Sequence, residues 1–151
     1  MRQVRFSTRS VYGLRAMFVL AQHYGRGALS VSTIAEREAI SLAYLEQLFH
    51  RLRKQGLVDS IRGPKGGYLL AKDPQVIRIG EIVRALDGDL LRMGERRRPS
   101  KDGHRSQQVV TRVVWERLHH KLTELLDETR LSDLTASSQD ARIEHKYTFH
   151  L

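Results

Sequence analysis

Two cations and three glycines lie within the seven residues RGPKGGY, from Arg62 to Tyr68. Backbone amides left open by glycine, together with Arg and Lys side chains, are suited to holding phosphate groups. A phosphate loop of the Walker type would need a Gly-Lys-Ser/Thr ending that opens a helix. Here the glycines run into the strand-like stretch YLLA. The pattern therefore excludes that kind of enzyme site and favours the tip of a basic hairpin.

A second set of residues able to do chemistry comprises Glu116 and His119, with His120 and Glu124 on adjacent turns of a predicted helix. Imidazole and carboxylate groups at this spacing can bind a metal ion. Opposite charges at the same spacing also pair on ordinary exposed helix faces, so we favour charged pairs and expect no metal site. Trp115 lies beside them without a carboxylate pair or a His–Ser arrangement, and we expect a packing anchor and no catalytic activity.

A series of helices would position the loop. Apolar periodicity predicts one helix from about Ser10 to Tyr24 and a short one capped by Ser30. The next helix, LAYLEQLFHRLRKQ, begins at a Ser41 cap and is the most informative. Its apolar stripe consists of Leu42, Leu45, Leu48, Phe49 and Leu52, and its opposite face of Ala43, Tyr44, Gln47, Arg51 and Lys54.

Two strand-like stretches, LVDSIR and YLLA, flank the glycine-rich loop and predict a hairpin. A short helix, a tight turn and a longer helix with a polar, basic outer face are typical of a helix-turn-helix. Followed directly by a basic hairpin, this arrangement is a winged helix. We therefore predict a mainly α-helical fold with a small β-wing, in which the loop contacts DNA.

Composition supports a polyanionic partner. The 151 residues include 26 Lys and Arg against 17 Asp and Glu, which gives a formal net charge of +9 and a pI near 10.3. Nucleic acid is the first candidate partner and an anionic membrane surface the second. The absence of cysteine excludes disulfides, thiolate metal sites and cysteine-ligated clusters. No stretch approaches the ~20 apolar residues of a membrane span, so we expect a cytoplasmic protein.

The second half of the chain contains a helix that we expect to join two copies of the chain. A long helix from about Val109 to Thr129 carries a continuous apolar seam, which we expect to pack against a second copy of the chain, because symmetric operators favour dimers. The alternative is a helix folded back on its own domain. The predicted interface residues are Val110, Val114, Trp115, Leu118, Leu122 and Leu125.

The predicted organisation has four parts. Residues 1–88 form a winged helix-turn-helix domain, and residues 89–108 form a basic loop. Residues 109–134 form the dimerisation helix and a following turn, and residues 135–151 a flexible tail.

The stretches ISLAYLEQLFHRLRKQGLV and RGPKGGYLLAKD lie in register in one helix–wing unit. They resemble the signature of the IscR-type regulators, bacterial winged-helix repressors and activators of the Rrf class. The likeness is strong from residue 1 to about residue 90 and weaker in TRVVWERL. It implies a homodimer that binds double-stranded promoter DNA. It also implies base reading by Tyr44, Glu46 and Gln47, and a minor-groove arginine at Arg62.

The chemistry of these residues agrees with the roles that the resemblance implies. Gln47 can pair with an adenine edge, Glu46 can accept a hydrogen bond from a cytosine amine, and Arg62 suits a narrow minor groove. Weaker candidates for phosphate contacts are Arg2, Ser7, Thr8, Arg9 and Lys65. The full predicted DNA-binding set is Arg2, Ser7, Thr8, Ser41, Ala43, Tyr44, Glu46, Gln47, Arg51, Arg62, Gly63, Lys65 and Gly66.

One departure concerns the sensor. Members of this family that sense iron–sulfur status or nitric oxide carry three cysteines before the long helix. In this chain the corresponding positions hold residues such as Glu95 and Val109, and a nearby histidine position holds Arg112. We therefore expect no cofactor. The chain is then a cluster-independent regulator, a sensor of an effector that the sequence does not identify, or an engineered cysteine-free form.

Two further alternatives stay open. The first is a cluster or metal sensor with His, Glu or Asp ligands, against which the lack of cysteine counts. The second is a protein-interaction module that binds a metabolic enzyme, against which the basic charge counts as a sole function.

Overall fold

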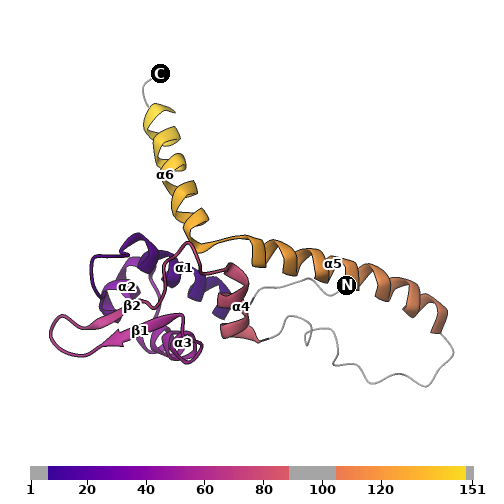
Figure 1. Cartoon of the computed structure of the whole chain (residues 1–151), viewed down its shortest axis with the longest axis horizontal. Coiled ribbons are helices and arrows are strands. Elements are labelled where there is room, and N and C mark those ends of the chain that lie inside the picture. The colour runs from indigo at the N-terminus through magenta and orange to yellow at the C-terminus, as the bar shows by residue number, and fades with distance from the viewer. Residues whose placement is uncertain (1–6, 89–104, 149–151) are drawn as a thin grey trace.

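The computed structural model describes residues 7–88 and 105–148, with side chains described for residues 7–88 and 111–139. Four helices and a hairpin form one body, from which two further helices extend in different directions (Figure 1). The body contains α1 (Thr8–Gln22), α2 (Val31–Glu38), α3 (Leu42–Lys54), β1 (Val58–Ile61), β2 (Gly67–Leu70) and α4 (Ile79–Asp87), and the extensions are α5 (Arg105–Glu128) and α6 (Leu131–Thr148).

Serine caps begin the first three helices. The hydroxyl of Ser30 accepts a hydrogen bond from the amide of Thr33 at 3.1 Å, and that of Ser41 accepts from Tyr44 at 3.3 Å. Ser7 caps α1 in the same way. Each cap satisfies an amide that the first helical turn leaves without a backbone partner. The starts of α2 and α3 are therefore where the sequence predicts them.

One hydrophobic core lies between these elements, and α3 contributes four of its largest fully buried side chains. Leu45, Leu48, Phe49 and Leu52 are buried, as the apolar stripe predicts. Leu42 belongs to the same predicted stripe but is 47% exposed, at the first position of the helix. The prediction for Leu42 is therefore wrong, while that for the rest of the stripe is confirmed.

The hairpin is a two-stranded antiparallel sheet in which Val58 pairs with Leu70 and Ile61 with Gly67. Its turn requires glycine at two positions. Gly63 has a φ of +114°, and a Cβ on Gly66 would lie 2.3 Å from the carbonyl oxygen of Ile61. The geometry of the turn is thus sufficient to explain why glycine stands there.

Helices α5 and α6 are joined to the body at a single junction. The amide of Ile79 donates to the carbonyl of Thr129 at 3.0 Å, and the amide of Leu131 donates to the carbonyl of Ile77 at 2.9 Å. The Leu131 side chain is completely buried in the core of the body. The first turn of α6 is therefore part of that core, although it follows the predicted winged domain in the sequence.

The prediction of a flexible tail from residue 135 differs from the structure, in which α6 continues to Thr148. Asp133 accepts a hydrogen bond from the amide of Arg130 at the start of the helix, at 2.8 Å. The hydroxyls of Thr135 and Ser137 donate to carbonyls three and four residues earlier, so these polar side chains find their partners within the helix.

Likewise, α5 begins at Arg105, inside the predicted basic loop, whose residues 89–104 lie outside the described part of the chain. The division of the chain into four parts stays a prediction. No helix within residues 7–88 and 105–148 is long and apolar enough to cross a membrane.

Asp87, at the end of α4, joins this helix to the start of α1. Its carboxylate accepts hydrogen bonds from the hydroxyls of Ser7 and Ser10 and, at 3.1 Å, from Nε of Arg9. Only 6% of its side chain is exposed. Ser10 is buried as well, so its hydroxyl has no water to replace the acceptor.

We expect the substitution Asp87→Ala to lower the free energy of unfolding by about 1–3 kcal/mol, because it leaves a buried donor without an acceptor. Urea denaturation followed by circular dichroism would measure the change. Asp59→Ala is the control, since Asp59 is exposed on β1. Equal losses in the two variants would show that the Asp87 contacts do not stabilise the fold.

Candidate nucleic-acid interface

The outer face of α3 is exposed, apart from the half-buried Tyr44. Ala43, Glu46, Gln47 and Arg51 all face solvent, on the side of the helix opposite the buried stripe. Within residues 7–88 and 111–139, no other side chain forms a hydrogen bond or ion pair with Glu46, Gln47 or Arg51. These polar groups are therefore free to bind a partner outside the chain.

Ser41 and Tyr44 are placed differently from the rest of the predicted set. The Ser41 hydroxyl is exposed but already accepts the hydrogen bond of the helix cap. Tyr44 is half-buried, and its ring meets that of Tyr12 edge to face, with 6.0 Å between the centroids. Both residues thus have structural contacts in addition to the base reading that the resemblance implies.

The wing lies beside α3. Arg62, Gly63 and Lys65 are exposed at its tip, whereas Gly66 is half-buried. The ring of Phe49 on α3 stacks on that of Tyr68 on β2, with centroids 4.5 Å apart and an angle of 9° between the planes. This stack holds the wing and the outer face of α3 in one relative orientation.

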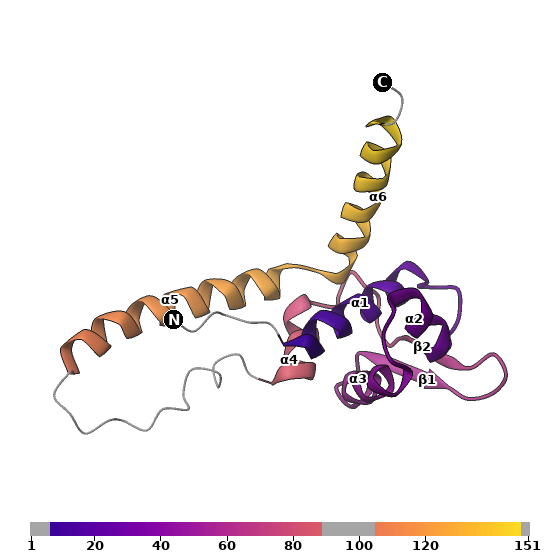
Figure 2. The same ribbon diagram turned by 180° about the vertical axis from the view of Figure 1, so that it is seen from behind.

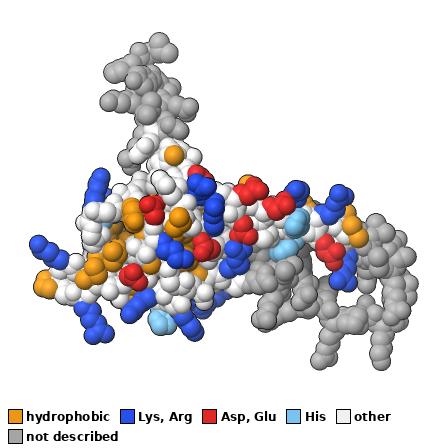
Figure 3. Space-filling view, viewed as in Figure 1, with side chains coloured by type: hydrophobic (Ala, Val, Ile, Leu, Met, Phe, Trp, Pro, Cys, Tyr) orange, Lys and Arg blue, Asp and Glu red, His pale blue; other side chains and the backbone are white. Residues whose placement is uncertain are grey.

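Basic side chains gather around the lower edge of the body and the hairpin tip in the space-filling view (Figure 3). Acidic side chains on this face lie mostly over the middle of the body and along α5. The edge therefore presents positive charge where α3 and the wing lie together, as a polyanion would require.

The start of α1 offers fewer free groups than the sequence suggests. The Ser7 hydroxyl is engaged with Asp87 and with the helix cap, and Arg9 forms an ion pair with the same carboxylate. Thr8 is exposed in the first turn. Arg2 lies outside the described residues. Among the candidates for phosphate contacts at the N-terminal end of the chain, Thr8 has a described side chain that is exposed and has no partner.

A family model described as an iron-dependent transcriptional regulator, Rrf2, matches residues 6–137. The chain belongs to the Rrf2 family. The transcriptional regulator IscR of Sodalis glossinidius (strain morsitans) is 37% identical to it over 137 residues, which cover 90% of this chain and 81% of that protein. IscR of Klebsiella pneumoniae (strain 342) is 38% identical, with coverage of 90% and 82%.

Solved structures agree with this assignment. IscR of T. potens superposes with a TM-score of 0.74 at 40% identity, and the match covers 91% of this chain and 90% of that one. CymR, the global cysteine regulator of B. subtilis, superposes with a TM-score of 0.75 at 37% identity, with coverage of 89% and 98%. The predicted family, the winged-helix fold class and the prediction of a transcriptional regulator that is not an enzyme are confirmed.

The description of the Rrf2 family includes iron dependence, and this chain lacks the ligands of one kind of iron site. A thiolate-held cluster requires cysteine ligands, and the chain contains none. Among the residues that the structure describes, no group of three or more His, Asp or Glu side chains gathers as a metal site would require. Glu95 lies outside the described residues, as does the side chain of Val109.

Helix α5 of this Rrf2-family protein extends away from the body and contacts it near its C-terminal end, as Figure 1 and Figure 2 show from opposite sides. The predicted alternative, in which this helix folds back on its own domain, is therefore wrong. Its seam lacks a partner within the described chain: Val114, Trp115, Leu118 and Leu125 are exposed by 52% to 60%, and Leu122 is half-buried. The side chain of Val110 lies outside the described residues.

Charged pairs occupy the rest of α5, as its spacing predicts. Arg112 and Glu116 are 2.8 Å apart, and Glu124 accepts a hydrogen bond from Lys121 at 2.8 Å. That bond holds the pKa of the Glu124 carboxyl below its ordinary value and raises the pKa of Lys121. His120 lies 3.2 Å from Glu124 as well. These contacts are those of a solvent-exposed helix face.

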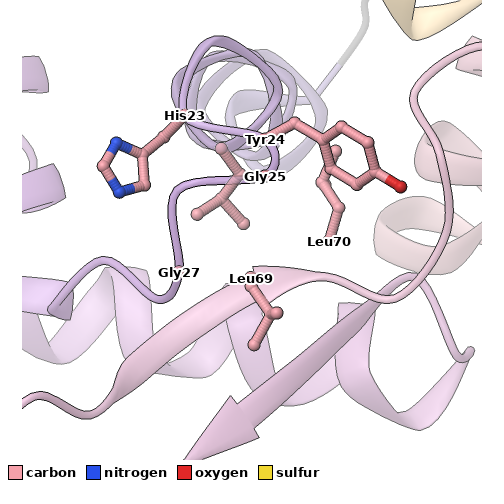
Figure 4. Close-up of a pocket in the computed structure, with 7 residues that line it drawn as sticks. His23, Tyr24, Gly25, Gly27, Leu69 and Leu70 are labelled. Atoms are coloured by element: carbon pink, nitrogen blue, oxygen red, sulfur yellow. The ribbon is translucent and has the colours of Figure 1, made fainter.

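A hollow of about 350 Å³ lies between the end of α1 and strand β2 (Figure 4). Leu20, Leu69 and Leu70 contribute apolar side chains to it. Its titratable side chains are His23 and Tyr24, which extend to opposite sides of the opening. The hollow therefore holds no acid–base pair of the kind that catalysis uses.

Proposed function

We propose that this Rrf2-family protein is a homodimer that binds double-stranded promoter DNA in the cytoplasm and does so without a cysteine-ligated iron–sulfur cluster. The observation that carries the proposal is that two exposed elements, the outer face of α3 and the basic tip of the wing, are joined by a direct contact. The stack of Phe49 on Tyr68 holds them together.

In this proposal α3 enters the major groove. The amide of Gln47 can donate to and accept from an adenine edge, and Glu46 can accept from a cytosine amine. Arg51 would lie toward the backbone as a phosphate contact. Exposure and the lack of described side-chain partners support these roles, because a group already paired within the protein would lose that contact on binding DNA.

The wing would lie beside the same site. Arg62 would enter the minor groove and Lys65 would contact phosphate, with the affinity falling as salt rises because each contact releases counterions. Helix α5 would join two copies through its exposed seam, so that two copies of α3 face successive half-sites of a symmetric operator.

We expect Arg62→Ala to weaken binding to an operator duplex by about 1–3 kcal/mol, since the arginine would contribute both charge and groove fit. Fluorescence anisotropy with duplexes from the region upstream of the chain's own coding sequence, at two salt concentrations, would measure this loss. Arg130→Ala removes the same charge at the exposed α5–α6 junction and serves as the control. If the two variants bind equally well, the wing does not contact DNA as proposed.

A further inference from the structure

The turn between α2 and α3 is held in place from α1. Arg15 donates from Nε to the carboxylate of Glu38 at 2.8 Å and from Nη2 to the carbonyl oxygen of the same residue, also at 2.8 Å. Glu38 is the last residue of α2. Ala39 follows in the left-handed conformation, with a φ of +53°. Arg15 therefore binds both the side chain and the backbone of Glu38 at the point where the chain turns toward α3.

The same arginine contacts a pair of aromatic rings. Its guanidinium carbon lies 5.4 Å from the centroid of the Tyr12 ring, over its face. The Tyr12 ring meets Tyr44 at an interplanar angle of 87°, with centroids 6.0 Å apart. A continuous series of contacts thus runs from Glu38 through Arg15 and Tyr12 to Tyr44.

This series ends at the first turn of α3. The first turn of the helix carries Leu42 and Ala43, which are both exposed, whereas burial of the apolar stripe begins at Leu45. Two ring or hydrogen-bond contacts involve the side chains of this turn within the described chain. One is the hydrogen bond of the Ser41 cap, and the other is the edge-to-face contact of Tyr44 with Tyr12. The contact with α1 therefore helps to orient the turn, together with Ile40, which is buried in the core just before the cap.

The contribution of these residues is to orientation more than to stability. Arg15 and Glu38 are both partly exposed, and exposed ion pairs add little to the free energy of folding. Tyr12 and Tyr44 are half-buried at the margin of the core. Small changes at this margin would shift the first turn, which carries Ala43 and leads into Glu46 and Gln47, without unfolding the domain.

We propose that Tyr12 and Arg15 are positioning residues that fix the first turn of α3 and thereby set its discrimination between base sequences. The inference rests on the proposed function, in which α3 reads DNA. Neither residue needs to touch DNA for this role. It predicts that their loss reduces sequence discrimination more than it reduces non-specific binding.

The test compares Tyr12→Leu, Tyr12→Phe and Arg15→Ala with the unchanged protein. The readout is the dissociation constant for a duplex with one half-site scrambled divided by that for the intact duplex, which is selected from a randomised library, at constant salt. Tyr12→Leu and Arg15→Ala should reduce this ratio about 3- to 10-fold, the range that one aromatic contact supplies. Tyr12→Phe keeps the ring and should keep the ratio.

Arg130→Ala controls for the lost charge of Arg15 and should leave the ratio unchanged. An unchanged ratio in both Tyr12→Leu and Arg15→Ala would overturn the proposal. Arg15 is partly exposed, so Arg15→Ala remains a folded test protein if Tyr12→Leu does not fold.

Hydrogen exchange separates this inference from the proposed function. The amides of Tyr44 and Leu45 bond to the side chain and the carbonyl of Ser41. They should exchange faster in Tyr12→Leu and Arg15→Ala, while amides of α4 keep their rates. If the unchanged protein does not discriminate between duplexes, the proposed function fails, and exchange still decides the positioning role. Unchanged exchange at both amides would refute that role.

Discussion

The variant Leu118→Glu is expected to be a monomer at concentrations where the unchanged protein is a dimer. Leu118 lies in the middle of the α5 seam and is 52% exposed in the single chain. The substitution therefore costs the fold of one chain little. In the proposed dimer it would bury a carboxylate without a partner, at a cost of several kcal/mol. Sedimentation velocity would measure the assembly state, with circular dichroism as the check on folding.

The matched control is Arg112→Gln, which makes the same change in net charge on α5 outside the seam. It should remain a dimer. Operator affinity should fall in Leu118→Glu by about 10²–10⁴-fold, because separate chains lose the effective concentration that links the two half-sites. A dimeric Leu118→Glu protein would place the interface elsewhere on the molecule.

The variant Phe49→Ala is expected to lose about 3–5 kcal/mol of unfolding free energy, a large share of the roughly 5–15 kcal/mol that holds a domain folded. Phe49 is completely buried and stacks on Tyr68. Its removal would leave a cavity between α3 and β2 that the surrounding side chains fill only in part. Urea denaturation would measure the loss, and the slope with denaturant should stay constant.

Two comparisons sharpen this result. Phe49→Leu fills much of the same volume and should cost less, while Tyr24→Ala removes a ring that is 47% exposed and should cost little. If Phe49→Ala proves no more harmful than Tyr24→Ala, the junction of helix and wing does not depend on the stack.

The elements of the proposed interface could be predicted because their signals are local. Ser30 and Ser41 satisfy amides three residues away, and the buried leucines of α3 recur at helical spacing. The wing is equally local, since Gly63 and Gly66 serve the turn in which they lie. Such features depend on a few neighbouring residues and can be recognised without knowledge of the fold.

Contacts between distant parts of the chain could not be predicted in this way. Asp87 accepts hydrogen bonds from residues at the other end of the winged domain in the sequence. The Tyr12 ring packs on the Tyr44 ring of α3, and no pattern within α1 predicts that contact. The helical state of α6 was hidden by its serines and threonines, which favour loops in general but here donate to the helical backbone. Contacts of this kind can be identified from the three-dimensional structure and not from the local sequence.

The burial of Leu131 affects how the protein folds while it is being synthesised. The residue completes a core whose other members are all in place by Leu86. A ribosome adds about 5–20 residues per second, so roughly 2–9 seconds pass between the synthesis of Leu86 and that of Leu131. During that interval the nascent chain exposes the apolar surface that Leu131 later covers. Chaperones that recognise such surfaces would therefore meet this protein late in its synthesis, after the DNA-reading elements have already emerged.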